Sequence, residues 1–139
     1  MTEIIRDETG TQRTLGYVLE IGHADGGARC HLDVGEEHAN RHGVLHGGIA
    51  TAILDNAMGA TSSLSVDPRG REPFMTITMS TQFLAPALTG KRVTARGRIT
   101  GGGRSLLFVE GELVDEDDRL IATATGVFKR ARRGQDGVA

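Results

Sequence analysis

Apolar and polar residues alternate between Ala28 and Val34. Ala28, Cys30, Leu32 and Val34 fall on one face of an extended segment, and the residues between them are charged or polar. This period of two predicts a strand, and with the similar text after Gly16 it predicts a hairpin joined through residues 24–27. Cys30, the only cysteine, is expected to be a small core residue.

The period becomes helical between His46 and Ser63. Apolar residues recur there at the spacing of one helix face, namely Ile49, Ile53, Ala57, Ala60 and Leu64. A turn signal, the run "VDPRG", follows directly. We therefore predict one long amphipathic helix over 46–63.

After Pro73 the chain alternates again in four successive segments. In the first segment the expected faces are Met75, Ile77, Met79 and Phe83 against Thr76, Thr78, Ser80 and Gln82. In the second, Val93, Ala95, Gly97 and Ile99 oppose Thr94, Arg96, Arg98 and Thr100. Short connections between these segments predict antiparallel strands.

These elements predict an α+β fold in which one long central helix is wrapped by an antiparallel sheet of about six strands. A chain of 139 residues fits a single domain over 1–139, with its core at about 16–128 and a short polar, basic C-terminal tail. The tail includes the basic run Lys129 to Arg133, which is expected to be solvated, and a fraying end after it.

Composition limits the possible partners. The net charge is −2 and aromatic residues are 4% of the chain, so nucleic acid is not an expected partner. No secretory signal opens the sequence, and no apolar run reaches the ~20 residues of a membrane span, so we expect a cytoplasmic protein without membrane contact.

The predicted helix starts with His46, Gly47 and Gly48 and carries Asp55 in its middle. Unpaired N–H groups at a helix start suit a developing oxyanion, and glycine lets a ligand approach closely, although the glycines can equally serve tight packing. An aspartate costs helix stability and needs a partner or a role. It either lies on a solvated face, pairs with Asn56 or an arginine, or acts as a base or nucleophile.

Gly47 and Asp55 are too far apart to act together within one chain. Eight residues of helix separate them by about 12 Å and roughly 80° of rotation. An antiparallel helix from a second subunit would bring its Asp55 opposite Gly47, and two-fold symmetry would create two such sites. If the two residues cooperate, the protein is at least a dimer.

Two other motifs carry weaker signals. His38, His42 and His46 have the spacing of a helical zinc site, but Gly43 argues against that helix, and we expect no metal. The run "GGGRS", Gly101 to Ser105, lacks the ending of a phosphate-binding loop and is expected to be a hairpin turn, in which Arg104 is solvated or meets an anionic ligand.

The run "HANRHGVLHGGIATAILDNAMG" resembles the signature of hotdog-fold acyl-CoA thioesterases of the phenylacetate-pathway (PaaI) type, and the likeness extends over about 16–128. It implies that Asn40 and the Gly47 N–H polarise the thioester carbonyl while His46 shapes that end of the site. Asp55 of the facing subunit would activate water or attack directly. Thr76, or Thr78 or Ser80 instead, would hold the water. Contacts to coenzyme A are implied for Gly48, Gly103, Arg104 and Ser105.

The leading hypothesis is therefore an acyl-CoA thioester hydrolase acting on aryl or medium-chain acyl groups as a homodimer or dimer of dimers. It needs no cofactor, since coenzyme A is part of the substrate. Alternatives are an acyl-thioester hydratase or dehydratase, for which His46 is the candidate catalytic histidine, and a non-catalytic acyl-CoA-binding module. The width of the acyl pocket depends on which of Met58, Leu64, Phe74 and Phe83 face the site.

Overall fold

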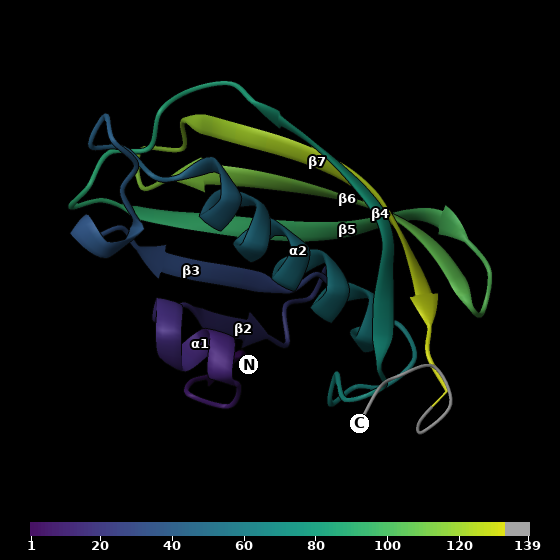
Figure 1. Ribbon diagram of the computed structural model, residues 1–139. Coiled ribbons are helices and arrows are strands. Elements are labelled where there is room, and N and C mark those ends of the chain that lie inside the picture. Colours follow the sequence, from purple (N-terminus) through teal and green to yellow (C-terminus); the bar gives the residue numbers. More distant parts are fainter. Residues whose placement is uncertain (133–139) are drawn as a thin grey trace.

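The computed structural model describes residues 1–132 and shows one antiparallel sheet curled around one long helix (Figure 1). Seven strands are hydrogen-bonded in the order β1-β2-β3-β5-β6-β7-β4. This confirms the predicted α+β class with a central helix. The elements are β1 (Glu3–Ile5), α1 (Gly10–Leu15), β2 (Val18–Ile21), β3 (Arg29–Asp33), the 3-10 helix η1 (Glu36–His38), α2 (Gly47–Leu64), β4 (Phe74–Phe83), β5 (Arg92–Gly102), β6 (Leu106–Asp115) and β7 (Leu120–Arg130).

Helix α2 lies within one residue of its predicted bounds and packs one face on the sheet. Ile53, Leu54, Ala57 and Met58 are fully buried in that face. Each such large side chain contributes about 1.5–3 kcal/mol by leaving water. Met58, considered above as a pocket residue, thus belongs to the core.

Two glycines let α2 lie close to the middle of the sheet. Gly97 in β5 and Gly111 in β6 are opposite each other in the ladder. A Cβ at Gly97 would lie 2.8 Å from the Ala57 carbonyl oxygen and still closer to Thr61 Oγ1. A Cβ at Gly111 would lie 2.9 Å from Met58 Sδ, so the helix could not keep this position over larger residues.

The alternation expected for β3 is confirmed. Ala28, Cys30, Leu32 and Val34 are all at most 2% exposed. Burial raises the pKa of the Cys30 thiol to about 12, so Cys30 stays a protonated core residue.

The alternation expected for β4 is wrong at its start. The pairing with β7 shifts between Thr76 and Thr78, which leaves Ile77 as an extra residue. Thr76 pairs with the buried Phe128, whereas Thr78 pairs with Val127 on the next position of β7. This β-bulge places Thr76 on the same face of the sheet as α2, although strict alternation puts it on the other.

The N-terminal segment adds two elements that the sequence did not predict. Strand β1 pairs with β2 and brings the sheet to seven strands. Helix α1 starts at a capping box formed by Thr9 and Gln12 and ends at Gly16, which has φ of 84°. Ordered structure therefore begins well before residue 16.

The basic run near the C-terminus is not wholly a solvated tail. Lys129 and Arg130 belong to β7, and the Arg130 N–H donates to the Ser105 carbonyl oxygen at 2.7 Å. Arg130 also lies 3.4 Å from a Glu72 carboxylate oxygen. The expected fraying end, residues 133–139, lies outside the described part of the chain.

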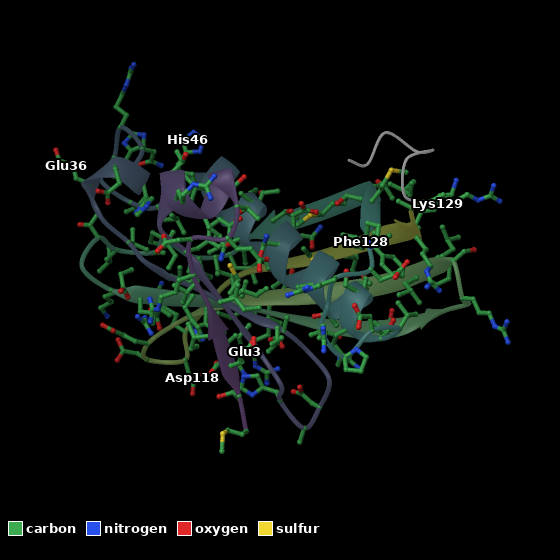
Figure 2. The ribbon with its side chains drawn as sticks, turned by 90° about the horizontal axis from the view of Figure 1, so that it is seen from below. Glu3, Glu36, His46, Asp118, Phe128 and Lys129 are labelled. Atoms are coloured by element: carbon green, nitrogen blue, oxygen red, sulfur yellow. The ribbon has the colours of Figure 1, made fainter. Side chains whose placement is uncertain are left out.

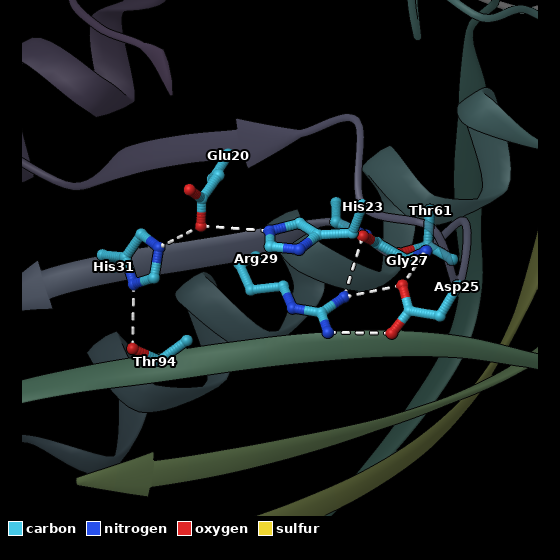
Figure 3. Close-up of polar contacts among 9 residues, drawn as sticks. Glu20, His23, Asp25, Gly27, Arg29, His31, Thr61 and Thr94 are labelled. Carbon is cyan, nitrogen blue, oxygen red and sulfur yellow. Dashed lines mark hydrogen bonds and ion pairs between the residues drawn. The ribbon is translucent and has the colours of Figure 1, made fainter. Parts of the chain in front are cut away.

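The face of the sheet away from α2 carries a polar network (Figure 3). Glu20 Oε1 lies 3.0 Å from His31 Nε2 and 3.1 Å from His23 Nε2, and His31 Nδ1 lies 2.8 Å from Thr94 Oγ1. The hydrogen bond with His31 and the further contact with His23 lower the pKa of Glu20. The network ties β2 to β3 and β3 to β5.

Candidate active site

The start of α2 leaves one backbone donor available. His46 caps the helix, and its Nδ1 accepts the Gly48 N–H at 2.8 Å. The Ile49 and Ala50 N–H groups both donate to the His46 carbonyl oxygen at 3.0 Å. Among the residues that the structure describes, only the Gly47 N–H of this first turn has no hydrogen-bond acceptor. It also sits at the positive end of the helix dipole, so it suits a polarised carbonyl.

The loop before α2 fixes Asn40. Its Oδ1 accepts the His42 N–H at 2.9 Å and the Val44 N–H at 3.3 Å. Gly43, with φ of 77°, closes this turn by donating to the Asn40 carbonyl oxygen at 3.0 Å. Because the side-chain oxygen is occupied, the Nδ2 amide is the part of Asn40 left to donate to a ligand.

Asn40 and Gly47 line the same hollow, which we call the Gly47 hollow. It has a volume of about 390 Å³, and its other lining residues include Ala50, Phe83 and Ala87. A Cβ at Gly47 would lie 3.3 Å from the Phe83 ring. Two candidate donors thus converge on one cavity beside an exposed aromatic ring.

Asp55 is held by Thr76. Thr76 Oγ1 donates to Asp55 Oδ1 at 2.6 Å, across from the middle of α2 to β4. Asp55 is half-buried, and the Asn56 amide donates to the Tyr17 hydroxyl instead of to Asp55, so the expected pairing with Asn56 is not found. Thr78 and Ser80 line a different hollow with Thr100 and Phe108, away from Asp55.

Asp55 and Thr76 line a second cavity, the Asp55 hollow, of about 320 Å³. Asn56, Gly59 and Phe74 also line it. It has no lining residue in common with the Gly47 hollow. Figure 2 shows His46, which caps one end of α2, well apart from Phe128, which lines the Asp55 hollow.

Within one chain the two halves of the predicted site are therefore separate. Gly47 and Asp55 belong to one unbroken helix, eight residues and so about 12 Å apart along its axis. A single carbonyl cannot contact both groups in the same chain.

The turn expected to meet coenzyme A is a hairpin turn, as predicted. It joins β5 to β6, and the Gly103 N–H donates to the Leu106 carbonyl oxygen at 2.8 Å. Arg104 is exposed, and neither hollow is lined by Gly103, Arg104 or Ser105. Gly48, the remaining expected contact, has its N–H occupied by His46.

Two of the three histidines at zinc-like spacing have hydrogen-bond partners within the fold, His46 in the Gly48 N–H and His38 in two backbone groups. His38 is buried; its Nδ1 accepts the Gly35 N–H at 2.9 Å, and its Nε2 lies 2.7 Å from the Leu15 carbonyl oxygen. No group of three or more metal-ligating side chains occurs within residues 1–132. Over the same range, no helix is both long and apolar enough to cross a membrane.

Sequence reasoning considered Asn56 only as a partner of Asp55, whereas the structure places it in the lining of the Asp55 hollow, donating to the Tyr17 hydroxyl at 3.2 Å. Burial raises the pKa of Tyr17, which is 3% exposed. Phe74 and Phe83 were both considered, and the structure places one in each hollow.

Comparison with known proteins identifies the family of the chain. The model of the thioesterase superfamily matches residues 42–122. Acyl-coenzyme A thioesterase 13 from Homo sapiens is 30% identical over 112 residues, which are 80% of this chain and 78% of that protein. The chain belongs to the thioesterase superfamily.

Comparison with solved structures narrows the position of the chain within this superfamily. The structure of the E. coli PaaI protein from the phenylacetic acid degradation operon has a TM-score of 0.79 at 20% identity, covering 91% of this chain and 87% of that one, and shows the common fold. A mutant of the phenylacetic acid degradation protein PaaI from Thermus thermophilus has a TM-score of 0.71 at 27% identity, covering 88% of this chain and 100% of that one. The protein is a thioesterase of the PaaI-like hotdog type, as its sequence predicted.

Proposed function

We propose that the protein hydrolyses acyl-CoA thioesters to coenzyme A and a carboxylic acid, at sites shared between two subunits. The observation that carries this proposal is the division of one site into two hollows. Asn40 and Gly47 supply donors in one hollow, and Asp55 and Thr76 supply a carboxylate and a hydroxyl in the other. Each hollow has what the other lacks.

A two-fold dimer would join the halves. Strand β4 is an edge strand that pairs only with β7, and an unpaired edge of ten residues is a template for pairing with another chain. Ile77, Phe83 and Leu84, on or directly after this strand, are each more than half exposed. Such apolar exposure next to both hollows favours an interface there, and two such dimers would form the proposed dimer of dimers.

In this dimer the thioester carbonyl oxygen accepts hydrogen bonds from the Gly47 N–H and from Asn40 Nδ2. Attack on the carbonyl carbon moves negative charge onto that oxygen, and one preorganised donor contributes about 3–4 kcal/mol to stabilising it. The Gly47 N–H suits this role because its neighbours in the first turn are already occupied.

Asp55 of the partner subunit then takes a proton from water as the water attacks. Attack by its carboxylate to form a mixed anhydride is equally compatible with the geometry. Thr76 orients the carboxylate through its hydroxyl, which donates to Asp55 Oδ1. The exposed turn at Arg104 is the proposed contact for the anionic nucleotide part of coenzyme A.

Hydrolysis is favoured over hydration by the role of His46. A hydratase needs a catalytic histidine, and His46 Nδ1 instead accepts the Gly48 N–H. A non-catalytic acyl-CoA-binding module would bind substrate without releasing thiol.

The test is free-thiol release by the purified protein from phenylacetyl-CoA, benzoyl-CoA and medium-chain acyl-CoAs. Asp55→Asn, which can still accept the Thr76 hydrogen bond, should lower kcat by about 10²-fold or more. Asp117→Asn, in an exposed turn, is the matched control and should leave turnover unchanged. The proposal is wrong if no acyl-CoA is hydrolysed, or if Asp55→Asn keeps full turnover.

A further inference from the structure

Asn56, next to Asp55 in α2, makes a contact that the chemistry described above does not use. Its side-chain Nδ2 donates to the Tyr17 hydroxyl at 3.2 Å. Asn56 is half-buried and lines the Asp55 hollow together with Asp55 itself. Asparagine is an unfavourable residue for the middle of a helix, so its presence there calls for a specific role.

Tyr17 holds the Asn56 amide from a fixed position. It directly precedes β2, is 3% exposed and belongs to the hydrophobic core. Burial raises the pKa of its hydroxyl, and the negative charge of Asp55 raises that pKa as well. The hydroxyl therefore stays protonated at neutral pH, and it lies near enough to Asp55 to be affected by its charge.

The two neighbouring side chains of α2 are held from opposite sides. Thr76 of β4 donates to Asp55 Oδ1 at 2.6 Å, and Tyr17, beside β2, accepts from Asn56. Figure 1 shows α2 with β4 on one side and β2 on the other. Thr76 and Leu19 of β2 both line the Asp55 hollow, whereas Tyr17 is not part of that lining. The hollow therefore lies between the two anchored side chains.

These contacts determine which atoms can bind water in the hollow. An asparagine side chain has one donor nitrogen and one acceptor oxygen. Because Nδ2 of Asn56 is bound to Tyr17, outside the lining of the hollow, Oδ1 is the atom that can accept a hydrogen bond inside it. An ionised carboxylate accepts about four hydrogen bonds, so Asp55 can accept more than the one from Thr76. Two neighbouring acceptors thus belong to one hollow.

We infer that Asn56 Oδ1 and the Asp55 carboxylate together orient the attacking water, and that Tyr17 positions Asn56 for this role. The inference rests on the proposed function and takes water as the attacking group. A water molecule attacks through a lone pair, so both of its hydrogens must point away from the carbonyl carbon. Asp55 fixes one O–H bond, and Asn56 fixes the other.

Every proton in this step has a defined place. The water oxygen forms a bond to the thioester carbon, Asp55 takes one water proton, and the other stays hydrogen-bonded to Asn56 Oδ1. Negative charge moves onto the carbonyl oxygen. When that charge returns, the C–S bond breaks and Asp55 gives its proton to the departing sulfur, which releases coenzyme A and the carboxylic acid. Asn56 exchanges no proton, so its effect is on the geometry of the water.

The test measures kcat and ligand binding for Asn56→Ala and Tyr17→Phe. Alanine favours the helix, and phenylalanine keeps the buried ring of Tyr17, so both variants should fold. On the acyl-CoA that the wild type hydrolyses fastest, Asn56→Ala should lower kcat about tenfold, the scale of one lost hydrogen bond, and Tyr17→Phe about threefold to tenfold. The dissociation constant of the matching S-alkyl-CoA thioether, which has no carbonyl to hydrolyse, should stay within about twofold of the wild-type value.

A double variant separates positioning of the water from a purely structural role. Because Tyr17 acts through Asn56, adding Tyr17→Phe to Asn56→Ala should change kcat by less than about a further twofold. If Asn56 only satisfied the buried hydroxyl, the variants would change the melting temperature and keep kcat. Ser65→Ala removes a hydrogen bond to the Ser62 carbonyl oxygen at the end of α2, outside the lining of the Asp55 hollow. It is the matched control and should keep wild-type kcat.

The water assignment is overturned if Asn56→Ala keeps wild-type kcat, if the thioether binds more weakly in proportion to the loss of kcat, or if the losses of the single variants multiply in the double variant. In each of these cases thiol release by the wild type still supports the proposed hydrolase. If the wild type releases no thiol from any acyl-CoA, the proposed function fails and the water assignment fails with it.

Discussion

The single available N–H at Gly47 allows the oxyanion role to be tested without changing a side-chain function. Proline at this position removes the N–H, and the first residue of a helix tolerates proline well. The preceding residue, His46, has φ of −62° and ψ of 133°, which is the conformation that a residue before proline prefers. No described hydrogen bond is lost, because the Gly47 N–H has no acceptor.

We predict that Gly47→Pro lowers kcat about 10²-fold or more and leaves the melting temperature nearly unchanged. Gly47→Ala is the matched control: it keeps the N–H and brings a similar Cβ to within 3.3 Å of the Phe83 ring. Steady-state kinetics of both variants measure the loss of kcat, and thermal melts measure the change in melting temperature. If the two variants lose equal activity, crowding against Phe83 is the cause and the oxyanion role is wrong.

At the scale of elements, the contact between α2 and the sheet depends on glycine in β5. We predict that Gly97→Ala destabilises the protein by about 1–3 kcal/mol, the usual cost of overpacking, because its Cβ would meet the Ala57 carbonyl 2.8 Å away. Gly103→Ala, with nothing within 4 Å of the added carbon, should change stability by less than about 0.5 kcal/mol. Urea denaturation of both variants measures the difference, and equal stabilities would contradict the packing described here.

The outer face of the sheet gives a pH-dependent prediction. The pKa of Glu20 is lowered from its ordinary value of 4.5 by contact with His31 and His23. The folded pKa lies below the unfolded one, so this stabilisation is present above about pH 4.5 and is lost as the pH falls through the folded pKa.

Glu20→Gln should therefore lower the free energy of unfolding by about 0.5–1 kcal/mol at pH 7, the range of the net contribution of a hydrogen bond. The difference from the wild type should shrink towards zero as the pH falls below 4.5 and through the folded pKa of Glu20. Urea denaturation at several pH values measures it, with Glu36→Gln, an exposed residue, as the control. A difference that does not change with pH would exclude the contacts of the ionised Glu20 carboxylate as its source.

The sequence predicted the elements in which the hydrophobic pattern extends over many residues, and it missed the short elements. Helix α2 and the strands from β2 onward carry repeated patterns, and all were found. Strand β1 has three residues and α1 has six, too few for a period to show, and both depend on β2 and the cap at Thr9 for their order.

The types of residue in the candidate site were predictable from the sequence. The hydrogen-bond partner of Asp55 was not. Thr76, Thr78 and Ser80 are equivalent in the sequence, and regular alternation would turn Thr76 away from α2. The bulge at Ile77 selects Thr76, and it arises from the pairing of β4 with β7, which local sequence does not reveal.

At the scale of the whole molecule, a shared site predicts complementation between two inactive variants. In a mixed dimer of Asp55→Asn and Gly47→Pro chains, one site carries both changes and the other carries neither. An equal mixture that exchanges subunits should therefore recover about one quarter of wild-type activity, since half of the dimers are mixed and each has one intact site of two.

The measurement is thiol release after the two variants are co-expressed or refolded together, with each variant alone as the control. Each variant alone should stay near its own low turnover. Recovery to about one quarter supports sites built from two chains. No recovery, in a mixture shown to contain mixed dimers, would mean that each chain uses its own Asp55 and Gly47.

The separation of the Gly47 and Asp55 hollows has a consequence for the number of working catalytic centres in a solution of the protein. In the proposed dimer each monomer holds half of each catalytic centre, so the number of working centres would follow the law of mass action for association. On this proposal, specific activity should fall when the protein is diluted below the dissociation constant of the dimer, and the amount of the chain would act as a control on its own turnover.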